Sequence, residues 1–411
     1  MKKKIWLRGL VGVGVLASLS LLVACGGPTK KTATSTLNVT MGLSDEEWKV
    51  MNQDVLPAFE KESGIKVNAI QMEAADVEKK LQASVAAKRN DIDVISQDVN
   101  TTAQLVADGY MEDLSDQTKI IPSSTYPIQK QVGVFNGKTY FLPYRPNVEI
   151  NYYNKTKFDK YGLQPPTNWD ELLTVAKTLK AKEGIGRVAF KMSGDVIELV
   201  EFIRSAGGDP LNLNDAGTVT ALTYLQKLMP YLSADTLKGT FSTTNTFLAK
   251  DEVYYMPNWP FATNIIVGDG GRKDILATSG FAGPKEQVKT LGGEVLGVVK
   301  GTKNKAAALK FIKYLETKQV QQLLLKKNGW PSFRADVTGT VTGWQAPYYQ
   351  ATDAALKIAQ PLPNVTYMPD VNKLINDIFQ ETCVQGKDVK TVLQDYQPKL
   401  AKIKAEAKKA Q

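Results

Sequence analysis

NYYNKTKFDKYGLQPPTNWDEL, residues Asn151–Leu172, is the stretch of sequence that indicates the fold most sharply. A strand is predicted to end at Asn154. Phe158 and Tyr161 then lie one helical turn apart in a short helix, and Gly162 supplies its stop signal. A strand that leads directly into a helix is the repeating unit of α/β folds.

The second half of this stretch opens a longer helix. Pro165 and Pro166 interrupt the chain, and Thr167 precedes Asp170 by three residues, a capping-box pattern for a helix that runs to about residue 182. Trp169 falls in the first turn of that helix. We interpret Trp169 as a packing anchor rather than a ligand contact, because large aromatic side chains are mostly buried.

Strands and helices also alternate on the N-terminal side of this stretch. Ser44 and Glu47 form another capping box, and Pro57 is expected to kink or shorten the helix that follows. The strand–helix–strand order implies parallel pairing with right-handed crossovers. The predicted elements are strands at 37–41, 65–70 and 93–96, helices at 76–88 and 101–109, and a long helix at 303–327 closed by Asn328-Gly329.

The first residues have the layout of an export signal. Lysines and Arg8 precede an apolar run that ends in Leu22-Val23-Ala24-Cys25, which looks like a lipobox in which the Cys25 sulfur receives diacylglycerol. We expect residues 1–24 to be a cleaved lipoprotein signal peptide and residues 25–36 a flexible tether. An uncleaved membrane anchor and plain secretion are the alternatives, although the run is shorter than the about 20 apolar residues that a spanning helix needs.

Charge and residue types exclude several classes of function. The formal net charge is +9, and loss of residues 1–24 removes four positive charges and no negative ones. The remaining lysines are dispersed without an aromatic-interleaved basic cluster, so we expect no nucleic-acid partner. The chain has no histidine, which excludes hydrolases with a histidine base and metal sites built on imidazole. We expect neither a metal nor a cofactor.

Cysteine usage is equally restrictive. With Cys25 acylated, Cys383 has no partner for a disulfide. Its helical context in DIFQETCVQG predicts a small buried apolar residue rather than a nucleophile.

With these elements in place, nearly all of the chain after the signal resembles the bacterial extracellular solute-binding proteins of the carbohydrate family that includes the maltose-binding protein. The order and spacing of several segments carry this resemblance together. They are FEKESGIKV (59–67), DVISQD (93–98), LVADGYMEDL (105–114), LPYRPNVEINYYNKTKFDKYGLQPPTNWDEL (142–172), YYMPNWPF (254–261), LGGEVLGV (291–298) and NKAAALKFIKYL (304–315).

The resemblance implies a two-lobed α/β fold of the periplasmic-binding-protein type II, with a ligand cleft between lobes that are joined at hinge crossings. It also implies a monomeric, lipid-anchored component of an ABC importer at the extracytoplasmic face of the cell membrane. This component would capture a sugar and deliver it to the transmembrane permease subunits, without catalytic residues. The crossings are expected near residues 145, 282 and 335, which assigns 37–145 and 283–335 to lobe I and 146–282 and 336–411 to lobe II.

The chemistry of sugars guides the choice of site residues. C–H faces stack on aromatic rings and hydroxyl groups need hydrogen-bond partners, so a sugar site combines aromatic side chains with carboxylates, amides and an arginine. The resemblance makes Trp259, between Pro257 and Pro260, the first candidate. The other positions that it assigns to ligand binding are Asp45, Glu46, Asp98, Asn100, Tyr144, Arg145, Asn147, Asp195, Gly293, Glu294, Trp330 and Tyr367.

Several of these assignments have alternatives. Asp195 follows Ser193-Gly194 and can be a turn residue, whereas Trp330 and Tyr367 can be packing residues. Asn147 stands where the maltose-binding pattern has a glutamate, so specificity for maltose does not follow. The alternative functions are an extracellular carbohydrate-active hydrolase, which needs two carboxylates about 5 to 9.5 Å apart, and a binding protein for a non-sugar solute such as a polyamine.

Overall fold

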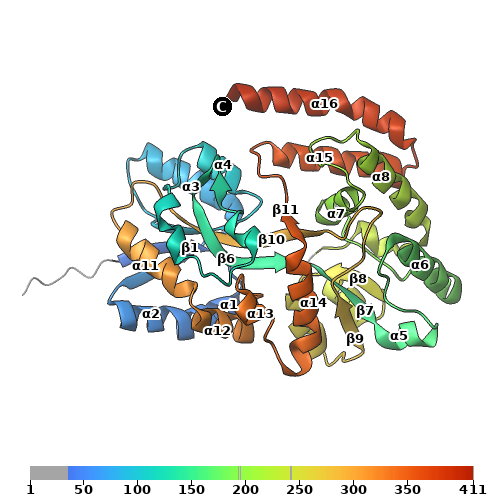
Figure 1. The fold of residues 1–411 in the computed structure, drawn as a ribbon, viewed down its shortest axis with the longest axis horizontal. Coiled ribbons are helices and arrows are strands. Elements are labelled where there is room, and N and C mark those ends of the chain that lie inside the picture. The colour runs from blue at the N-terminus through green and yellow to red at the C-terminus, as the bar shows by residue number, and fades with distance from the viewer. Residues whose placement is uncertain (1–35, 193, 195, 241–242, 411) are drawn as a thin grey trace, which may run out of the picture. The chain divides into compact units, whose positions relative to one another are not determined.

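The main sheet of the molecule lies in one of two α/β parts, and two of its strands run toward the other part (Figure 1). The computed structural model describes residues 36–192, 194, 196–240 and 243–410. The predicted signal peptide, Cys25, the tether up to residue 35, and Asp195 lie outside the described residues. No described helix is long and apolar enough to cross a membrane.

The main sheet has the strand order β11-β10-β3-β1-β2. Strand β6 also pairs with β10, along the edge of β10 that faces away from β3. As predicted, β1 is parallel to β2 and to β3, whereas β10 runs antiparallel to β3 and β6. The strands are β1 (Thr36–Met41), β2 (Lys66–Gln71), β3 (Val94–Asp98), β6 (Phe141–Val148), β10 (Lys289–Val298) and β11 (Ala359–Pro361).

Helices of lobe I flank this sheet. The capping box of α1 is confirmed, because Ser44 and Glu47 exchange backbone-to-side-chain hydrogen bonds of 2.8 and 3.3 Å. A π-helical turn, Met51–Val55, ends just before Pro57, where we expected an irregularity. The helices are α1 (Asp45–Val50), α2 (Leu56–Ser63), α3 (Ala74–Ala86), α4 (Thr102–Ala107), α11 (Lys305–Leu315), α12 (Lys318–Asn328) and α13 (Ala335–Thr338).

The single long helix predicted at 303–327 is wrong. Thr317 has an extended backbone and its side chain accepts a hydrogen bond from the Val320 amide, so a new helix, α12, begins there. Apolar residues recur at helical spacing on both sides of Thr317, but the step of five residues from the buried Leu315 to the buried Val320 places them on different helix faces. Gly329 closes α12 in the left-handed conformation, as predicted.

Lobe II is built on an antiparallel sheet of order β8-β7-β9. Helix α5 begins directly after β7 at Asn154, as the opening stretch predicts. The strands are β7 (Ile150–Asn154), β8 (Tyr255–Asn258) and β9 (Ile275–Thr278). The helices are α5 (Lys155–Lys160), α6 (Trp169–Glu183), α7 (Ile197–Ser205), α8 (Ala216–Leu228), α9 (Thr243–Ala249), α10 (Phe261–Thr263), α14 (Ala346–Lys357), α15 (Met368–Phe379) and α16 (Val389–Ala410). Outside lobe II, before β6, a separate hairpin pairs β4 (Val134–Phe135) with β5 (Lys138–Thr139).

Local details of lobe II refine the predictions. The cap of α6 is Asn168 rather than Thr167, because the Asn168 side chain accepts the hydrogen bond from the Glu171 amide. Trp169 is buried and stacks on Tyr224 at 4.3 Å between ring centroids, so its packing role is confirmed. Cys383 is also buried, and burial raises the pKa of its thiol to about 12.

Apolar side chains form a separate core in each lobe and a shared core between them. Lobe I packs around Val39 and Phe311, and lobe II packs around Phe202 and Phe379. The third core includes Phe141 of β6 and residues of both sheets. Because β7 follows β6 after one residue, the passage between lobes is short. The exact lobe boundaries that we placed near residues 145, 282 and 335 stay a prediction.

Candidate functional site

A row of polar residues crosses three neighbouring strands of the main sheet. Glu294 in the middle of β10 pairs with Asp98 of β3 on one side and with Arg145 of β6 on the other. Two prolines in β6 are tolerated because β6 forms a ladder only with β10, so their missing N–H groups break no second ladder. The pairing register therefore places charged residues from three strands side by side.

Arg145 is the hub of this row. Its guanidinium donates to Glu47 Oε1 at 2.8 Å and to Glu294 Oε1 at 2.6 Å, and lies 4.3 Å from the ring centroid of Trp330. The Trp330 indole N–H donates to the same Glu47 oxygen at 2.6 Å. The three charged side chains are only 16 to 23% exposed, so the pairs are partly shielded from water. One cation thus joins two carboxylates over an aromatic face.

Asp98 and Asn100 form the next part of the site, at the carboxyl end of β3. An Asp98 oxygen accepts a hydrogen bond from the Asn100 amide at 2.8 Å. Burial, reinforced by the negative charge of Glu294, raises the pKa of Asp98 to about 6 although the Asn100 amide opposes this rise. The Asn100 side chain accepts a hydrogen bond from the Leu362 amide at 3.2 Å. Asn100 therefore links the β3–α4 loop to the segment that follows β11.

Trp259 approaches the row from lobe II. It directly follows β8, as predicted, and its backbone carbonyl accepts a hydrogen bond from the Tyr152 hydroxyl at 3.3 Å. Its ring lies against β10, because a Cβ on Gly292 would stand 2.9 Å from Trp259 Cη2. Gly292 in turn pairs with Asn147 of β6. The ring is 7% exposed, so the described arrangement encloses it.

Gly293 permits the close contact between β6 and β10. Its φ is +99°, and a Cβ there would stand 2.0 Å from the Arg145 carbonyl oxygen. The register of the two strands shifts just after it, between Glu294 and Val295. Gly293 is thus required by the backbone that positions Glu294, whereas Gly292 leaves room for the Trp259 ring.

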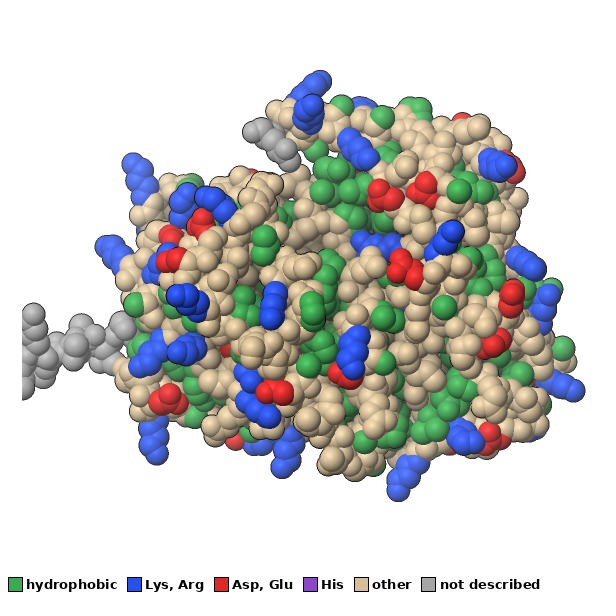
Figure 2. Space-filling view, viewed as in Figure 1, with side chains coloured by type: hydrophobic (Ala, Val, Ile, Leu, Met, Phe, Trp, Pro, Cys, Tyr) green, Lys and Arg blue, Asp and Glu red, His purple; other side chains and the backbone are tan. Residues whose placement is uncertain are grey.

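A cavity of about 330 Å³ opens beside this site. It lies between α3, β3 and α4 on one side and the start of α15 on the other, and Figure 2 shows the surface hollowed between the parts that carry these helices. Asn100 lines it together with Gln97, Val365 and Thr366. Its size falls in the range of small-molecule pockets, about 300 to 1,000 Å³.

The structure brings some predicted residues together and leaves others apart. Arg145, Glu294 and Trp330 are joined in one network. Adjoining it are Asp98 with its partner Asn100, Gly293, Asn147, Trp259, and the fully buried Tyr144 against Trp330. The exposed Asp45 and Glu46 in the first turn of α1, and the half-buried Tyr367 against the core of lobe II, lie apart from it.

Sequence reasoning missed two residues of the network. Glu47 was explained as the partner of Ser44 in a capping box, yet its other oxygen binds Arg145. Ser96 donates to the second oxygen of Glu294 at 3.1 Å. The pattern SxxE of the capping box gave no signal for the Arg145 contact, because that partner lies 98 residues away.

A second ionic cluster lies deeper in the molecule. Lys191 binds Glu149 and, at 2.6 Å, Glu198, and all three side chains are at most 2% exposed. Burial opposes the charge on Lys191, but the two carboxylates outweigh it and raise the pKa of this lysine. Nearby, Lys289 of β10 binds Glu201 of α7 at 2.8 Å. This cluster ties the junction of β6 and β7 to lobe II.

Comparisons with known proteins place this geometry in a family. A family model described as bacterial extracellular solute-binding protein matches residues 55–351. A maltooligosaccharide ABC transporter solute-binding lipoprotein of Streptococcus pneumoniae serotype 4 is 24% identical, with 94% of each chain covered. A candidate binding protein of Brucella abortus is 31% identical over 45% of this chain, so the chain spans less than half (44%) of that relative's length.

Solved structures share the fold. The sugar-binding protein MalE from Xanthomonas citri superposes with a TM-score of 0.82 at 17% identity, covering 91% of this chain and 98% of that one. Maltose-bound MalE3 of T. maritima gives a TM-score of 0.76 at 23% identity, with 89% and 99% covered. These matches confirm the predicted two-lobed α/β fold of type II. The match of the family model over more than half of the sequence shows that the chain belongs to the bacterial extracellular solute-binding proteins.

Proposed function

We propose that this protein captures a sugar between its two lobes and hands it to the permease subunits of an ABC importer, while a lipid on Cys25 anchors it at the extracytoplasmic face of the membrane. The sugar leaves as it arrived, because no bond in it is made or broken. Relatives named for maltooligosaccharides and for multiple sugars, and neighbours named for maltose, support the choice of ligand class.

The proposal rests mainly on one observation: an aromatic ring lies next to the row of polar residues on β3, β6 and β10. Trp259 of lobe II lies against Gly292, two residues before Glu294 on the same strand. A sugar has the same two surfaces, since its C–H groups stack on rings and its hydroxyl groups seek acceptors. When the lobes part, the ring of Trp259 is uncovered; when they close, the sugar is enclosed.

The acceptors of the row favour a ligand that is rich in hydrogen-bond donors. Two carboxylates, those of Glu47 and Glu294, bind the guanidinium of Arg145, and Asp98 pairs with Glu294 in the sheet register. The oxygens of Glu47 and Glu294 each accept at least one hydrogen bond within the protein, and a carboxylate oxygen has a further lone pair that a ligand hydroxyl group can use. A polyamine fits less well, because Arg145 already lies between Glu47 and Glu294.

The hydrolase alternative finds less support in the same contacts. A glycosidase needs one carboxylic acid poised to protonate the leaving oxygen and a second carboxylate across the bond. Glu47 and Glu294 instead both engage Arg145. We therefore assign these two carboxylates to holding the arginine and accepting hydroxyl groups.

A thermal-shift screen with product analysis tests the proposal. Maltose, maltotriose, maltotetraose, sucrose and spermidine are added to the purified protein, and at least one sugar at about 100 times its Kd should stabilise it by about 2.7 kcal/mol, seen as a rise of the melting temperature. Chromatography of the same mixtures should return the sugars intact. Stabilisation by spermidine alone, or the appearance of shorter sugars, would contradict the proposal.

A further inference from the structure

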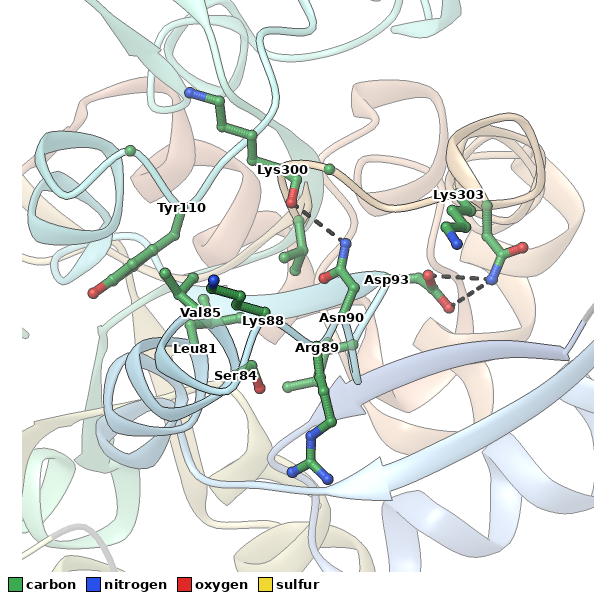
Figure 3. Close-up of a pocket in the computed structure, with 15 residues that line it drawn as sticks. Leu81, Ser84, Val85, Lys88, Arg89, Asn90, Asp93, Tyr110, Lys300 and Lys303 are labelled. Carbon is green, nitrogen blue, oxygen red and sulfur yellow. Dashed lines mark hydrogen bonds between the residues drawn. The ribbon is translucent and has the colours of Figure 1, made fainter.

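A second and larger cavity, of about 680 Å³, lies on lobe I. It is at the end of β3 opposite to Asp98. It is lined by residues just before the start of β3 and just after the end of β10. Four of its lining residues are cations, Lys88, Arg89, Lys300 and Lys303, which we call the basic rim (Figure 3). Asp93 is the carboxylate that lines it.

The positive charge of the basic rim is largely uncompensated. The Asp93 carboxylate is buried and accepts hydrogen bonds from the Asn38 amide at 2.8 Å and from the Asn304 side chain at 3.2 Å, so it is turned into the fold. Arg89 lies 3.5 Å from Asp91. Lys88, Lys300 and Lys303 form no ion pair with any residue that the structure describes.

The shape of the basic rim suits a surface better than a single small anion. Arg89 and Lys300 extend in opposite directions from the cavity in Figure 3, so the cations do not converge on one point. Between them lie apolar side chains, among which Leu81 is buried and Val85 is 62% exposed. Cations that are spread around an apolar centre suit a surface that presents many anionic groups together with exposed hydrocarbon.

The chain enters the described part of the molecule at this same edge. Thr36 opens β1, and its carbonyl accepts a hydrogen bond of 3.3 Å from Asn304, a residue that lines the cavity. Residues 25–35 separate Thr36 from Cys25, and eleven residues span at most about 40 Å when extended. A lipid on Cys25 would therefore keep the basic rim within reach of the membrane surface.

We propose that the basic rim docks on the anionic phospholipid head groups of the membrane in which the lipid of Cys25 is inserted. The docking surface rests on the lipid anchor of the proposed function. Attraction between cations and anionic lipids extends about 8 to 10 Å at physiological ionic strength, so the tether brings the rim into range and the rim then orients lobe I.

The test uses the soluble chain of residues 26–411, which contains every element of the compact unit that begins at residue 35. Its co-sedimentation is measured with vesicles of phosphatidylcholine alone and with one third phosphatidylglycerol, at low and high salt. The variant Lys88→Glu/Lys300→Glu/Lys303→Glu is compared with Lys402→Glu/Lys408→Glu/Lys409→Glu on the exposed end of α16, which changes net charge equally.

We expect binding to the anionic vesicles only, weakened by salt. Each lysine near an anionic surface contributes about fivefold to affinity, so the rim variant should bind at least about tenfold more weakly and the α16 variant within about threefold of the wild type. Equal loss in both variants, or binding abolished by 10 mM inorganic phosphate at constant ionic strength, would overturn the proposal. Thermal shifts with sugars in the same preparations report on the proposed function separately.

Discussion

Two ionic clusters contain residues that are only four positions apart in the sequence, Arg145 and Glu149, yet the clusters differ in their exposure to water. Arg145 and its two glutamates are 16 to 23% exposed at the crossing strands, whereas Lys191, Glu149 and Glu198 are at most 2% exposed. Glu149, which follows β6, also keeps one oxygen buried without a hydrogen-bond partner in the described part of the chain. The partly exposed cluster can offer acceptors to a ligand, and the buried one cannot.

The comparison separates a binding role from a structural one. Removing one partner of a fully buried pair leaves an uncompensated charge in a low dielectric, while a partly exposed pair is relieved by water. We therefore expect the buried cluster to govern stability and the Arg145 cluster to govern ligand affinity. Each prediction below changes one of the two clusters or their surroundings.

Lys191→Met should have the largest effect on stability. It leaves Glu149 and Glu198 buried beside each other without a cation, so the free energy of unfolding in urea should fall by about 3 to 5 kcal/mol. The matched control is Lys155→Met, whose pair with Asp159 is exposed on both sides and should matter little. Equal effects of the two substitutions would remove the distinction between the clusters.

Arg145→Met should lower the free energy of unfolding by less, about 2 kcal/mol, because water reaches Glu47 and Glu294. The same variant should lose sugar affinity in calorimetry, since both carboxylates lose the group that positions them. If Arg145→Met lost as much stability as Lys191→Met and bound sugar as tightly as the wild type, the assignment of a binding role to the Arg145 cluster would be contradicted.

Asp98→Asn should change the pH dependence of stability. The folded state holds the proton of Asp98 up to a pKa of about 6, above the ordinary 3.8, so Asp98 adds stability below pH 3.8 that is lost as the pH rises through 6. The shift corresponds to at most about 3 kcal/mol, and we expect about half, because the side chain is not fully enclosed. Unfolding curves at pH 4 and pH 7 should show the asparagine variant gaining relative to the wild type at pH 7; a constant difference would refute this assignment.

The smallest effect is expected outside both clusters. Asp45→Asn and Glu46→Gln change exposed side chains in the first turn of α1, so sugar affinity should change by less than about 0.5 kcal/mol. Glu47→Gln, one position further, should cost more because it weakens the bond to Arg145. Titrations of all three variants against the same sugar rank the positions directly.

Local signals in the sequence predicted much of the fold. The capping box at Ser44 and the left-handed Gly329 depend on residues within one or two helical turns, the burial of Trp169 was predicted from its residue type, and the structure confirms all three. The break at Thr317 was missed although the sequence carries a trace of it, a step of five residues between the apolar Leu315 of α11 and Val320 of α12. Local rules decide caps and turns, and such a step in the apolar spacing marks the boundary between two helices.

The candidate site was only partly predictable, because it is assembled from distant segments. The resemblance pointed to Arg145, Glu294 and Trp259, but nothing in the sequence pairs Glu47 with a residue 98 positions away. The burial of Lys191 was likewise invisible, since its partner Glu149 lies 42 positions away, between β6 and β7. Pairings of this kind depend on how distant segments pack together, which local sequence patterns do not show.

The central claim, that a sugar is held against Trp259 beside the polar row, is tested most directly by calorimetric titration of a sugar that binds the wild type. Trp259→Ala should weaken binding by about 1 to 3 kcal/mol, judged by aromatic stacking elsewhere, and Trp259→Phe by less. The control is Trp344→Ala. Trp344 lies in the turn just before α14 and is 52% exposed, so its substitution should leave sugar affinity unchanged. Unaltered affinity in a folded Trp259→Ala protein would contradict the account.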